Sequence, residues 1–271
     1  MQKMNVAMID YGRGNLRSVE RALERAGGKV TRVENEAGLK NAETVVLPGV
    51  GSFGDAVEGL KQRKLWDPLR EWVKGDRPFL GICLGFQLLW EEGEEAPGVK
   101  GLGLFGGRVS KFRAEGLKIP LIGWNQVRVQ DSKVNYFEGG DRFFYHVHSY
   151  RPESVSGEYL ICETEYGGWY PSGVKKGKVA GFQFHPEKSQ EAGIALLGKC
   201  FSLNSGRVTC IHSETYYFQF MINKLIRLTV LGLVVGLASA TMAGEGCGSC
   251  GDSDSGAKKK STNNVTPSDK K

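Results

Sequence analysis

Gly81-Ile82-Cys83-Leu84-Gly85 is the stretch that decides the fold of this chain. The apolar run Pro78-Phe79-Leu80 precedes it, and the helix-like run Phe86-Gln87-Leu88-Leu89-Trp90 follows it. This order predicts a strand, a sharp turn and a helix, the arrangement of a nucleophile elbow with cysteine as nucleophile. The glycines leave room for so tight a turn, and the N–H groups that open the next helix favour a negatively charged sulfur. From these five residues alone, a buried structural cysteine in a glycine-rich turn is an equally good interpretation.

Strand and helix signals alternate through the part of the chain that leads up to this turn. Such alternation predicts an α/β fold, an open sheet with a parallel core and helices on both faces. Ligands of such sheets bind beyond the carboxyl ends of the strands. Asp10, Val50, Gly51 and Cys83 all follow predicted strands, so we expect them to converge on one crevice. The predicted strands are 5–9, 30–33, 44–47 and 79–82, and the predicted helices are 16–26, 53–60 and 69–73.

The pattern changes at about Gly98, where short strand signals separated by turns replace the alternation. We expect an antiparallel or mixed sheet added to the parallel core, and a closing helix over 194–201. The predicted strands of this part are 104–112, 127–129, 143–148, 159–163 and 179–184.

The composition of the chain limits the classes of function that it can have. The chain has 271 residues, is 40% hydrophobic and 24% charged, and carries a net charge of +6. Part of that charge lies in two lysine clusters near the end of the chain, 258–260 and 270–271, so nucleic-acid binding is not indicated. Four cysteines are widely spaced without a metal or disulfide pattern, and the sequence enters a strand without a targeting peptide. These features predict a reduced, cytoplasmic protein.

The end of the chain has a different character. We predict a globular domain over 1–201, a linker over 202–220, a hydrophobic segment resembling a signal peptide over 221–243, and a disordered tail rich in Gly, Ser and Lys over 244–271. Our hypothesis is that a second coding sequence has been joined to that of a complete domain by gene fusion or read-through. The alternative is a real membrane anchor, which would bring membrane contact. If the intact mass of the native protein corresponds to a chain that ends near residue 201, it would support read-through. A mass that corresponds to the chain through Lys271 would exclude it.

A histidine and a glutamate later in the chain favour a catalytic role for Cys83. His185 ends an apolar strand signal, and Glu187 follows two residues later. A thiol needs a base to become a nucleophile, and the base needs a third group to fix its tautomer. Because alternate strand residues share a face, both side chains can point toward one site. We leave His146 unassigned and expect it to face the other side of its strand from His148.

Pro48-Gly49-Val50-Gly51-Ser52-Phe53-Gly54 supplies a glycine-rich turn after a strand. Its free backbone N–H groups can face an anion. Beside Cys83 they would form an oxyanion hole together with the N–H of Leu84. A phosphate loop is the competing interpretation, but no Gly-Lys-Ser/Thr follows, which excludes a Walker loop.

These motifs together resemble the class I, triad-type glutamine amidotransferases. Gly-Ile-Cys83-Leu-Gly-Phe-Gln and Phe-His185-Pro-Glu carry the resemblance, which covers about residues 4–201. Further motifs resemble the glutaminase subunits that serve histidine biosynthesis: Asp10-Tyr11-Gly-Arg-Gly-Asn15, Gly123-Trp124-Asn125, His148-Ser149-Tyr150 and Lys188-Ser. The resemblance implies a flavodoxin-like fold and no metal or organic cofactor.

The resemblance also implies a role for each matching residue. Cys83 would attack the amide of glutamine, His185 would move the proton, and Glu187 would orient His185. Ammonia would pass to a cyclase subunit with a (β/α)₈ barrel, as part of a heterodimer. Val50, Gly51 and Leu84 would surround the oxyanion, and the Val50–Gly51 peptide is expected to reorient first. The glutamine amino-acid end would be held by Gln87, His148, Ser149 and Tyr150, and the subunit interface would include Asn15, Trp124, Tyr145 and Lys188.

Three other functions remain as alternatives at this point. Gly12-Arg13-Gly14 and Glu34 are placed as in a dinucleotide-binding fingerprint, but Arg17 occupies the third glycine position and disfavours it. A class I amidotransferase that feeds a different synthase would carry the same triad. A membrane-tethered interaction protein with an inactive site would use the tail, but no member of the triad is missing.

Overall fold

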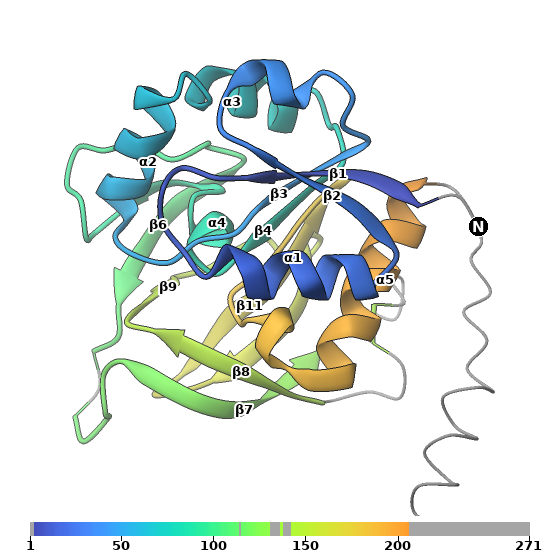
Figure 1. Ribbon diagram of the computed structural model, residues 1–271. Helices are drawn as coiled ribbons and strands as arrows, with labels where there is room; N and C mark the ends of the chain where they lie inside the picture. Colours follow the sequence, from blue (N-terminus) through green and yellow to red (C-terminus); the bar gives the residue numbers. More distant parts are fainter. Residues whose placement is uncertain (1–2, 114, 131–135, 138–141, 206–271) are drawn as a thin grey trace, which may run out of the picture. The chain divides into compact units, whose positions relative to one another are not determined.

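Five parallel strands form the centre of the described structure (Figure 1). They are ordered β2-β1-β3-β4-β12, and each pairs in parallel with its neighbours. This is the strand order of flavodoxin-like folds, in which the ligand lies at the carboxyl edge. The strands are β1 (Met4–Ile9), β2 (Gly28–Val33), β3 (Thr44–Leu47), β4 (Phe79–Ile82) and β12 (Val179–Phe182).

The computed structural model describes residues 3–113, 115–130, 136–137 and 142–205. The chain divides into two units, Met1–Thr209 and Cys210–Lys271, and every described residue belongs to the first. The predicted linker from residue 206 on, the hydrophobic segment and the tail lie outside the described residues. The division into domains therefore stays a prediction.

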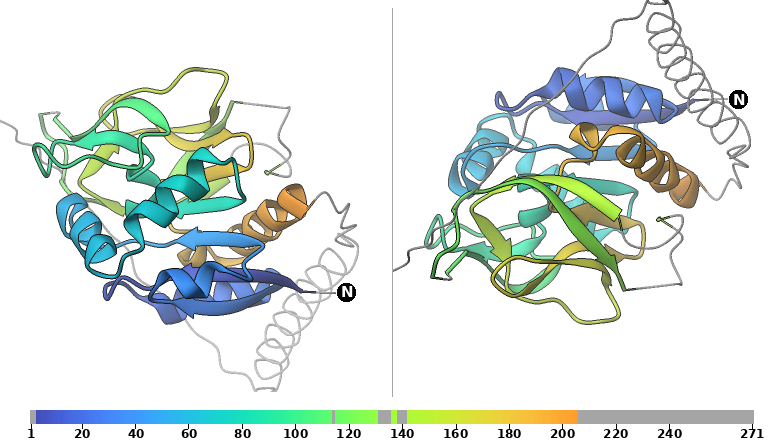
Figure 2. Two further views of the ribbon diagram at one scale, coloured as in Figure 1. Left: turned by 90° about the horizontal axis from the view of Figure 1, so that it is seen from above. Right: turned by 90° about the horizontal axis from the view of Figure 1, so that it is seen from below.

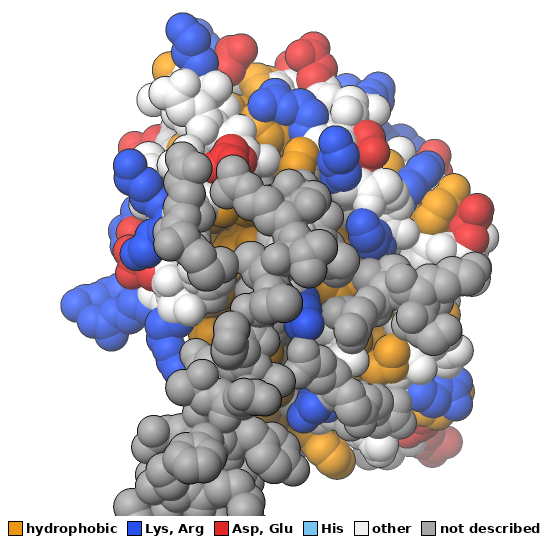
Figure 3. Space-filling model, turned by 90° about the vertical axis from the view of Figure 1, so that its right-hand side faces the viewer, with side chains coloured by type: hydrophobic (Ala, Val, Ile, Leu, Met, Phe, Trp, Pro, Cys, Tyr) orange, Lys and Arg blue, Asp and Glu red, His pale blue; other side chains and the backbone are white. Residues whose placement is uncertain are grey.

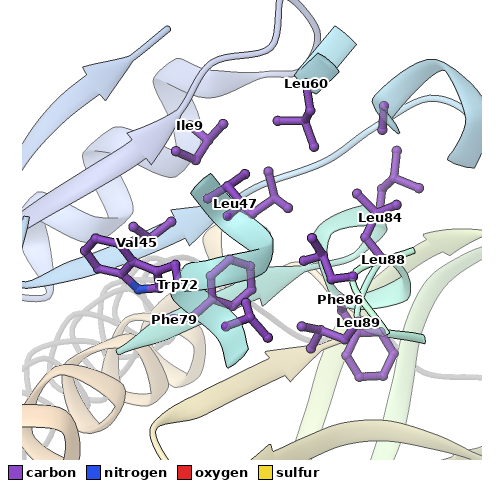
Figure 4. Packing of buried hydrophobic residues seen from close by; sticks show 14 of the residues in the cluster. Ile9, Val45, Leu47, Leu60, Trp72, Phe79, Leu84, Phe86, Leu88 and Leu89 are labelled. Carbon is purple, nitrogen blue, oxygen red and sulfur yellow. The ribbon is translucent and has the colours of Figure 1, made fainter. Parts of the chain in front are cut away.

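Helices cover both faces of the parallel strands, as the sequence predicts (Figures 1 and 2). On one face Leu60 and Trp72 pack with Phe79 and with Leu84 of the elbow, as Figure 4 shows. On the other face Leu23 and Leu197 pack with the opposite side chains of the strands. The first face carries α2 (Phe53–Gln62) and α3 (Trp66–Lys74), and the second carries α1 (Leu16–Arg25) and α5 (Gln190–Ser205).

An antiparallel extension continues the same sheet beyond β12. The order β12-β11-β10-β7-β8 makes a nine-stranded mixed sheet, and a separate three-stranded sheet has the order β5-β6-β9. The added strands are β7 (Leu121–Val129), β8 (Arg142–His148), β10 (Leu160–Glu165) and β11 (Trp169–Lys176), and those of the small sheet are β5 (Trp90–Gly93), β6 (Phe105–Lys111) and β9 (Tyr150–Pro152).

The sequence patterns missed β5, β9 and β11 and misplaced the end of the helix after the elbow. That helix, α4 (Leu84–Gln87), is a single turn and does not extend to Trp90. Its continuation is prevented because the carbonyls of Leu88 and Leu89 accept from the N–H groups of Leu102 and Leu104. Pairing with a distant segment therefore overrides the helical pattern. The strand predicted over 179–184 ends at Phe182. A short 3₁₀ helix, η2 (Pro186–Lys188), begins a few residues later. A second 3₁₀ helix, η1 (Glu36–Leu39), follows β2.

In the described part of the chain, no helix is both long and apolar enough to cross a membrane. On the face drawn in Figure 3, the visible basic and acidic side chains are interspersed.

The elbow is held by a close backbone approach at Gly85. A Cβ atom there would lie 1.9 Å from the carbonyl oxygen of Leu47. We expect Gly85→Ala to lower the free energy of unfolding by about 3 kcal/mol or more, because neither backbone can move without opening the sheet. Urea denaturation of the purified chain measures this loss. Gly106→Ala is the matched control, since a Cβ at Gly106 meets nothing within 4 Å, and an equal loss in both variants would contradict the explanation.

Candidate active site

Cys83 occupies the sharp turn between β4 and α4, in a backbone conformation that residues other than glycine rarely adopt. Its φ is +52° and its ψ is −102°. Such strain persists only where the surroundings impose it, and it concentrates at functional sites. Here the N–H of Cys83 donates to the carbonyl of Phe182 at 2.8 Å. Packing of Gly81 and Gly85 against neighbouring backbone leaves no space for other side chains. The turn therefore has the geometry expected of a nucleophile elbow.

His185 and Glu187 form a buried pair. His185 Nδ1 lies 2.7 Å from Glu187 Oε1, and both side chains are almost fully buried. The bond to Nδ1 leaves Nε2 available, and Nε2 has no hydrogen-bond partner among the described residues. The predicted pairing of these two side chains is present, but its cause is different. Glu187 lies in η2 and not on the strand, so the 3₁₀ turn brings the carboxylate back to the imidazole.

The backbone around His185 is tied to β8. The N–H of His185 donates to the Tyr145 carbonyl at 2.9 Å, and the Ser189 hydroxyl donates to the His185 carbonyl at 2.7 Å. The N–H of Tyr145 in turn donates to the Ser189 hydroxyl. These bonds hold the imidazole in place before any substrate binds, which is what catalysis by positioned groups requires.

Electrostatics couple His185 to Cys83. Burial of the imidazole disfavours its charged form, but negative charge on the Cys83 sulfur and on Glu187 outweighs that effect and raises the pKa of His185 to about 10. The charged form of the His185 imidazole is therefore favoured in this site. The Cys83 sulfur lies close enough to the His185 imidazole to interact with it.

The glycine-rich loop after β3 lies directly against the elbow. A Cβ atom at Gly49 would lie 2.5 Å from the Cβ of Leu84, so the loop backbone touches the start of α4. Gly51 has a φ of +108°, which only glycine adopts readily. The Tyr11 hydroxyl, whose pKa is raised by burial, donates to the Val50 carbonyl at 3.4 Å. The contact of Gly49 brings the loop that carries Val50 and Gly51 against the start of α4.

A polar network connects three of the four residues that we expect at the glutamine amino-acid end, namely Gln87, His148 and Tyr150. Gln87 Nε2 donates to the Tyr150 carbonyl at 2.9 Å, and His148 Nδ1 lies 2.9 Å from the same oxygen. The neighbouring Ser149 carbonyl accepts from the N–H of Phe112. Tyr150 and Ser149 are half-buried, whereas Gln87 and His148 are buried.

His146 faces the same side of β8 as His148, which corrects our expectation. Residues two apart on a strand share a face, and His146 Nδ1 lies 3.2 Å from His148 Nε2. The Tyr170 hydroxyl lies within hydrogen-bonding distance of both rings. Burial lowers the pKa of His148 to about 3 and also lowers that of His146, so both rings are neutral at pH 7.

Gln183 is the residue that our sequence reasoning missed. It is fully buried, and its Nε2 atom donates to Cys83 Sγ at 3.7 Å. The sequence contained a signal, because Gln183 is an uncharged polar residue between Phe182 and Phe184 in a strand that is otherwise apolar. Such a side chain needs a buried partner.

Three of the four predicted interface residues form one surface. The rings of Trp124 and Tyr145 meet edge to face with centroids 6.2 Å apart, and Lys188 Nζ lies 5.6 Å from the centroid of the Tyr145 ring. Asn15 is exposed at the start of α1. It joins Lys188, Glu187 and His185 in lining an open pocket.

In the described residues no three His, Cys, Asp or Glu side chains are grouped as metal ligands would be.

A family model described as glutamine amidotransferase class-I matches residues 7–202. The chain belongs to the class-I glutamine amidotransferases. A relative from Desulfitobacterium hafniense, named imidazole glycerol phosphate synthase subunit HisH, is 45% identical over 194 residues, which are 71% of this chain and 91% of the relative. The chloroplastic imidazole glycerol phosphate synthase hisHF of Arabidopsis thaliana is 40% identical over 195 residues, 71% of this chain and 33% of that protein. A crystal structure of a glutamine amidotransferase has the same fold, with a TM-score of 0.59 and 20% identity over 74% of this chain and 98% of that one.

The buried histidines of this amidotransferase make its stability depend on pH. The pKa of His148 falls from 6.5 to about 3 on folding, so between these values the unfolded chain binds a proton that the folded chain does not. Stability is therefore lost as the pH falls below about 6.5. The pKa of His146 is also lowered by burial, so we expect His146→Phe to remove one titrating group and to make the loss of stability between about pH 7 and pH 4.5 smaller.

Urea unfolding of wild type and His146→Phe at both pH values measures this difference. Carboxylates titrate equally in both proteins, so the comparison isolates the imidazole. Identical pH dependence in the two proteins would show that His146 is not held neutral by the fold.

Proposed function

We propose that this chain is the glutaminase subunit of imidazole glycerol phosphate synthase. It hydrolyses glutamine to glutamate and ammonia with Cys83, His185 and Glu187, and it passes the ammonia to a cyclase subunit. The observation that carries this proposal is the strained Cys83 turn facing an imidazole that Glu187 orients. Relatives named HisH subunits, which this chain matches over nearly their whole length, support the choice of synthase.

In the first half of the reaction the Cys83 thiolate attacks the amide carbon of the glutamine side chain. The carbonyl oxygen becomes an oxyanion, which backbone N–H groups of Gly51 and Leu84 would stabilise once the Val50–Gly51 peptide has turned. The His185 imidazolium then gives its Nε2 proton to the leaving nitrogen. The C–N bond breaks, ammonia leaves, and a thioester to Cys83 remains.

In the second half neutral His185 takes a proton from water, and the resulting hydroxide attacks the thioester. The C–S bond breaks, glutamate leaves and the thiolate is restored with an imidazolium beside it. Glu187 keeps the Nδ1 proton in place throughout, so that Nε2 alone exchanges protons. The raised pKa of His185 supports this cycle, because a protonated imidazole can donate to the leaving nitrogen.

Glutamine recognition is assigned to the buried end of the same crevice. Gln87, His148, Ser149 and Tyr150 would hold the amino-acid end of the substrate with polar groups that the network already orients. The side chain of glutamine would then extend toward Cys83.

The partner would cover the exposed face of β7 and β8. Ile122 is 57% exposed and Phe143 is 59% exposed, and they flank Trp124 and Tyr145 on paired strands. An apolar face of this kind beside the catalytic pair is suited to a subunit that receives ammonia without loss to water. The Arabidopsis relative, which carries the matching third within a longer synthase chain, supports a cyclase as the partner. That cyclase would be a (β/α)₈ barrel that forms imidazole glycerol phosphate and aminoimidazole carboxamide ribotide.

Replacing the nucleophile tests the proposed function. We expect Cys83→Ala to abolish ammonia release from glutamine, while the cyclase mixed with the variant still uses added ammonium salt at the wild-type rate. Product formation with each nitrogen source is the measurement. If product formation from added ammonium salt were lost to the same extent as product formation from glutamine, the role assigned to Cys83 would be wrong. Ammonia release stimulated by another synthase and not by this cyclase would favour an amidotransferase of a different pathway.

The proposed partner surface is tested by a matched pair of tryptophan variants. We expect Trp124→Ala to weaken binding of the cyclase about tenfold or more, because exposed aromatic residues at the centre of an interface contribute most of its affinity. Trp169→Ala is the control, since Trp169 is similarly exposed but lies on β11 and stacks on Arg128. Titration of the cyclase followed by calorimetry measures both, and equal affinities of the two variants would place the interface elsewhere.

A further inference from the structure

We propose that Gln183 is a positioning residue for the nucleophile, which holds the Cys83 sulfur through a hydrogen bond from its side-chain amide. The bond joins Gln183 Nε2 to Cys83 Sγ at 3.7 Å, and Gln183 has no exposed surface. The inference rests on the proposed function only in taking Cys83 as the nucleophile.

The strand register brings Gln183 to Cys83. Gly181 lies opposite Gly81 and Phe182 opposite Ile82 in the parallel pair of β12 and β4. Continuing the register by one residue places Gln183 opposite Cys83. The Gln183 N–H donates to the Ser172 carbonyl of β11 at 2.9 Å, which fixes its backbone. Since both backbones are held by the sheet, the amide cannot withdraw from the sulfur without breaking strand pairing.

A second glutamine decides which end of the Gln183 amide faces the sulfur. Gln87 Nε2 donates one hydrogen to the Tyr150 carbonyl and the other to Gln183 Oε1 at 3.1 Å. Because Oε1 of Gln183 is used as an acceptor there, its Nε2 must be the end that faces Cys83. A flipped amide would set a carbonyl oxygen against the sulfur and two NH₂ groups against each other.

The histidine pair fixes the far end of this network. The Tyr150 carbonyl accepts from His148 Nδ1 as well as from Gln87, so its two lone pairs are both used. His148 must then carry its hydrogen on Nδ1, and its Nε2 accepts from His146 Nδ1. Each member of the network has one orientation available, which gives the donor to Cys83 a fixed direction.

A hydrogen bond from a neutral amide stabilises a thiolate more than a thiol, because the acceptor then carries a full charge. It does so without competing for the proton, which a charged donor such as lysine would do. Gln183 and His185 would therefore divide the work: the imidazole exchanges the proton, and the amide holds the anion. Burial raises the pKa of the Tyr11 and Tyr170 hydroxyls, and negative charge on this sulfur raises it further, so both face the sulfur as neutral groups.

The test is the rate at which iodoacetamide alkylates Cys83 as a function of pH, in the full chain without glutamine. Mass spectrometry of the peptide that contains Cys83 separates it from the other cysteines. We expect Gln183→Met, which keeps the size but has no donor, to move the midpoint of the rate–pH curve upward by about one pH unit. Gln183→Glu places a carboxylate beside the sulfur, and we expect a larger upward movement. If Gln183→Met does not fold, Gln183→Glu carries the test with the same readout.

Ser110→Ala is the control for loss of a buried hydrogen bond. Ser110 is buried in β6 and bonds to Glu153, with no contact to Cys83. We expect it to lower stability without moving the alkylation midpoint. Midpoints for both Gln183 variants equal to that of wild type would overturn the proposal and leave Gln183 a packing residue.

Activity gives a second readout. In the complex with the cyclase, we expect Gln183→Met to lower kcat/KM for glutamine by roughly 10- to 100-fold. We also expect the acid limb of the plot of kcat/KM against pH to move together with the alkylation midpoint. Ammonium-dependent product formation should be unchanged. If wild type released no ammonia from glutamine, the proposed function would fail, whereas the alkylation curves would still decide the role of Gln183.

Discussion

Parallel pairing of β4 with β12 is the constraint on which the rest of the site depends. The two strands are about a hundred residues apart in the chain, and they meet with Ile82 opposite Phe182. The N–H of Cys83 donates to the Phe182 carbonyl at the end of this pair. A slip of one residue would turn Gln183 and the following segment to the opposite face. Nucleophile, amide donor and imidazole therefore come together through one register.

Glycines make this register compatible with the turn that follows it. Gly81 and Gly85 let the elbow lie against backbone, and Gly49 lets the loop after β3 lie against Leu84. The strain at Cys83 is sustained by this packing, since the surrounding helices and strands are buried on both faces. The same close packing sets the loop that carries Gly51 against Leu84 through Gly49.

Burial sets the charge state of the neighbouring groups in opposite directions. His146 and His148 have no anion beside them, so burial keeps them neutral and suited to orient a network. His185 is equally enclosed, but the Cys83 sulfur and Glu187 hold its proton. Three buried histidines thus take different roles because of their neighbours, not because of their depth. The network reaches from Tyr150, in the proposed glutamine site, to the sulfur through Gln87 and Gln183, which gives substrate recognition a physical link to the nucleophile.

The sequence by itself determined the parallel core, the elbow and the family, because period, glycines and motif order are local properties. The strands predicted over 44–47 and 79–82 coincide with β3 and β4, and a class-I amidotransferase model matches residues 7–202. Only the tertiary structure decided the length of α4, the course of β5, the shared face of His146 and His148, and the contact between Gln183 and Cys83. Each of these depends on a bond between segments far apart in the chain, such as Leu102 to Leu88 or Gln87 to Tyr150. No local pattern encodes such a bond, since its partner is chosen by the register of the folded sheet.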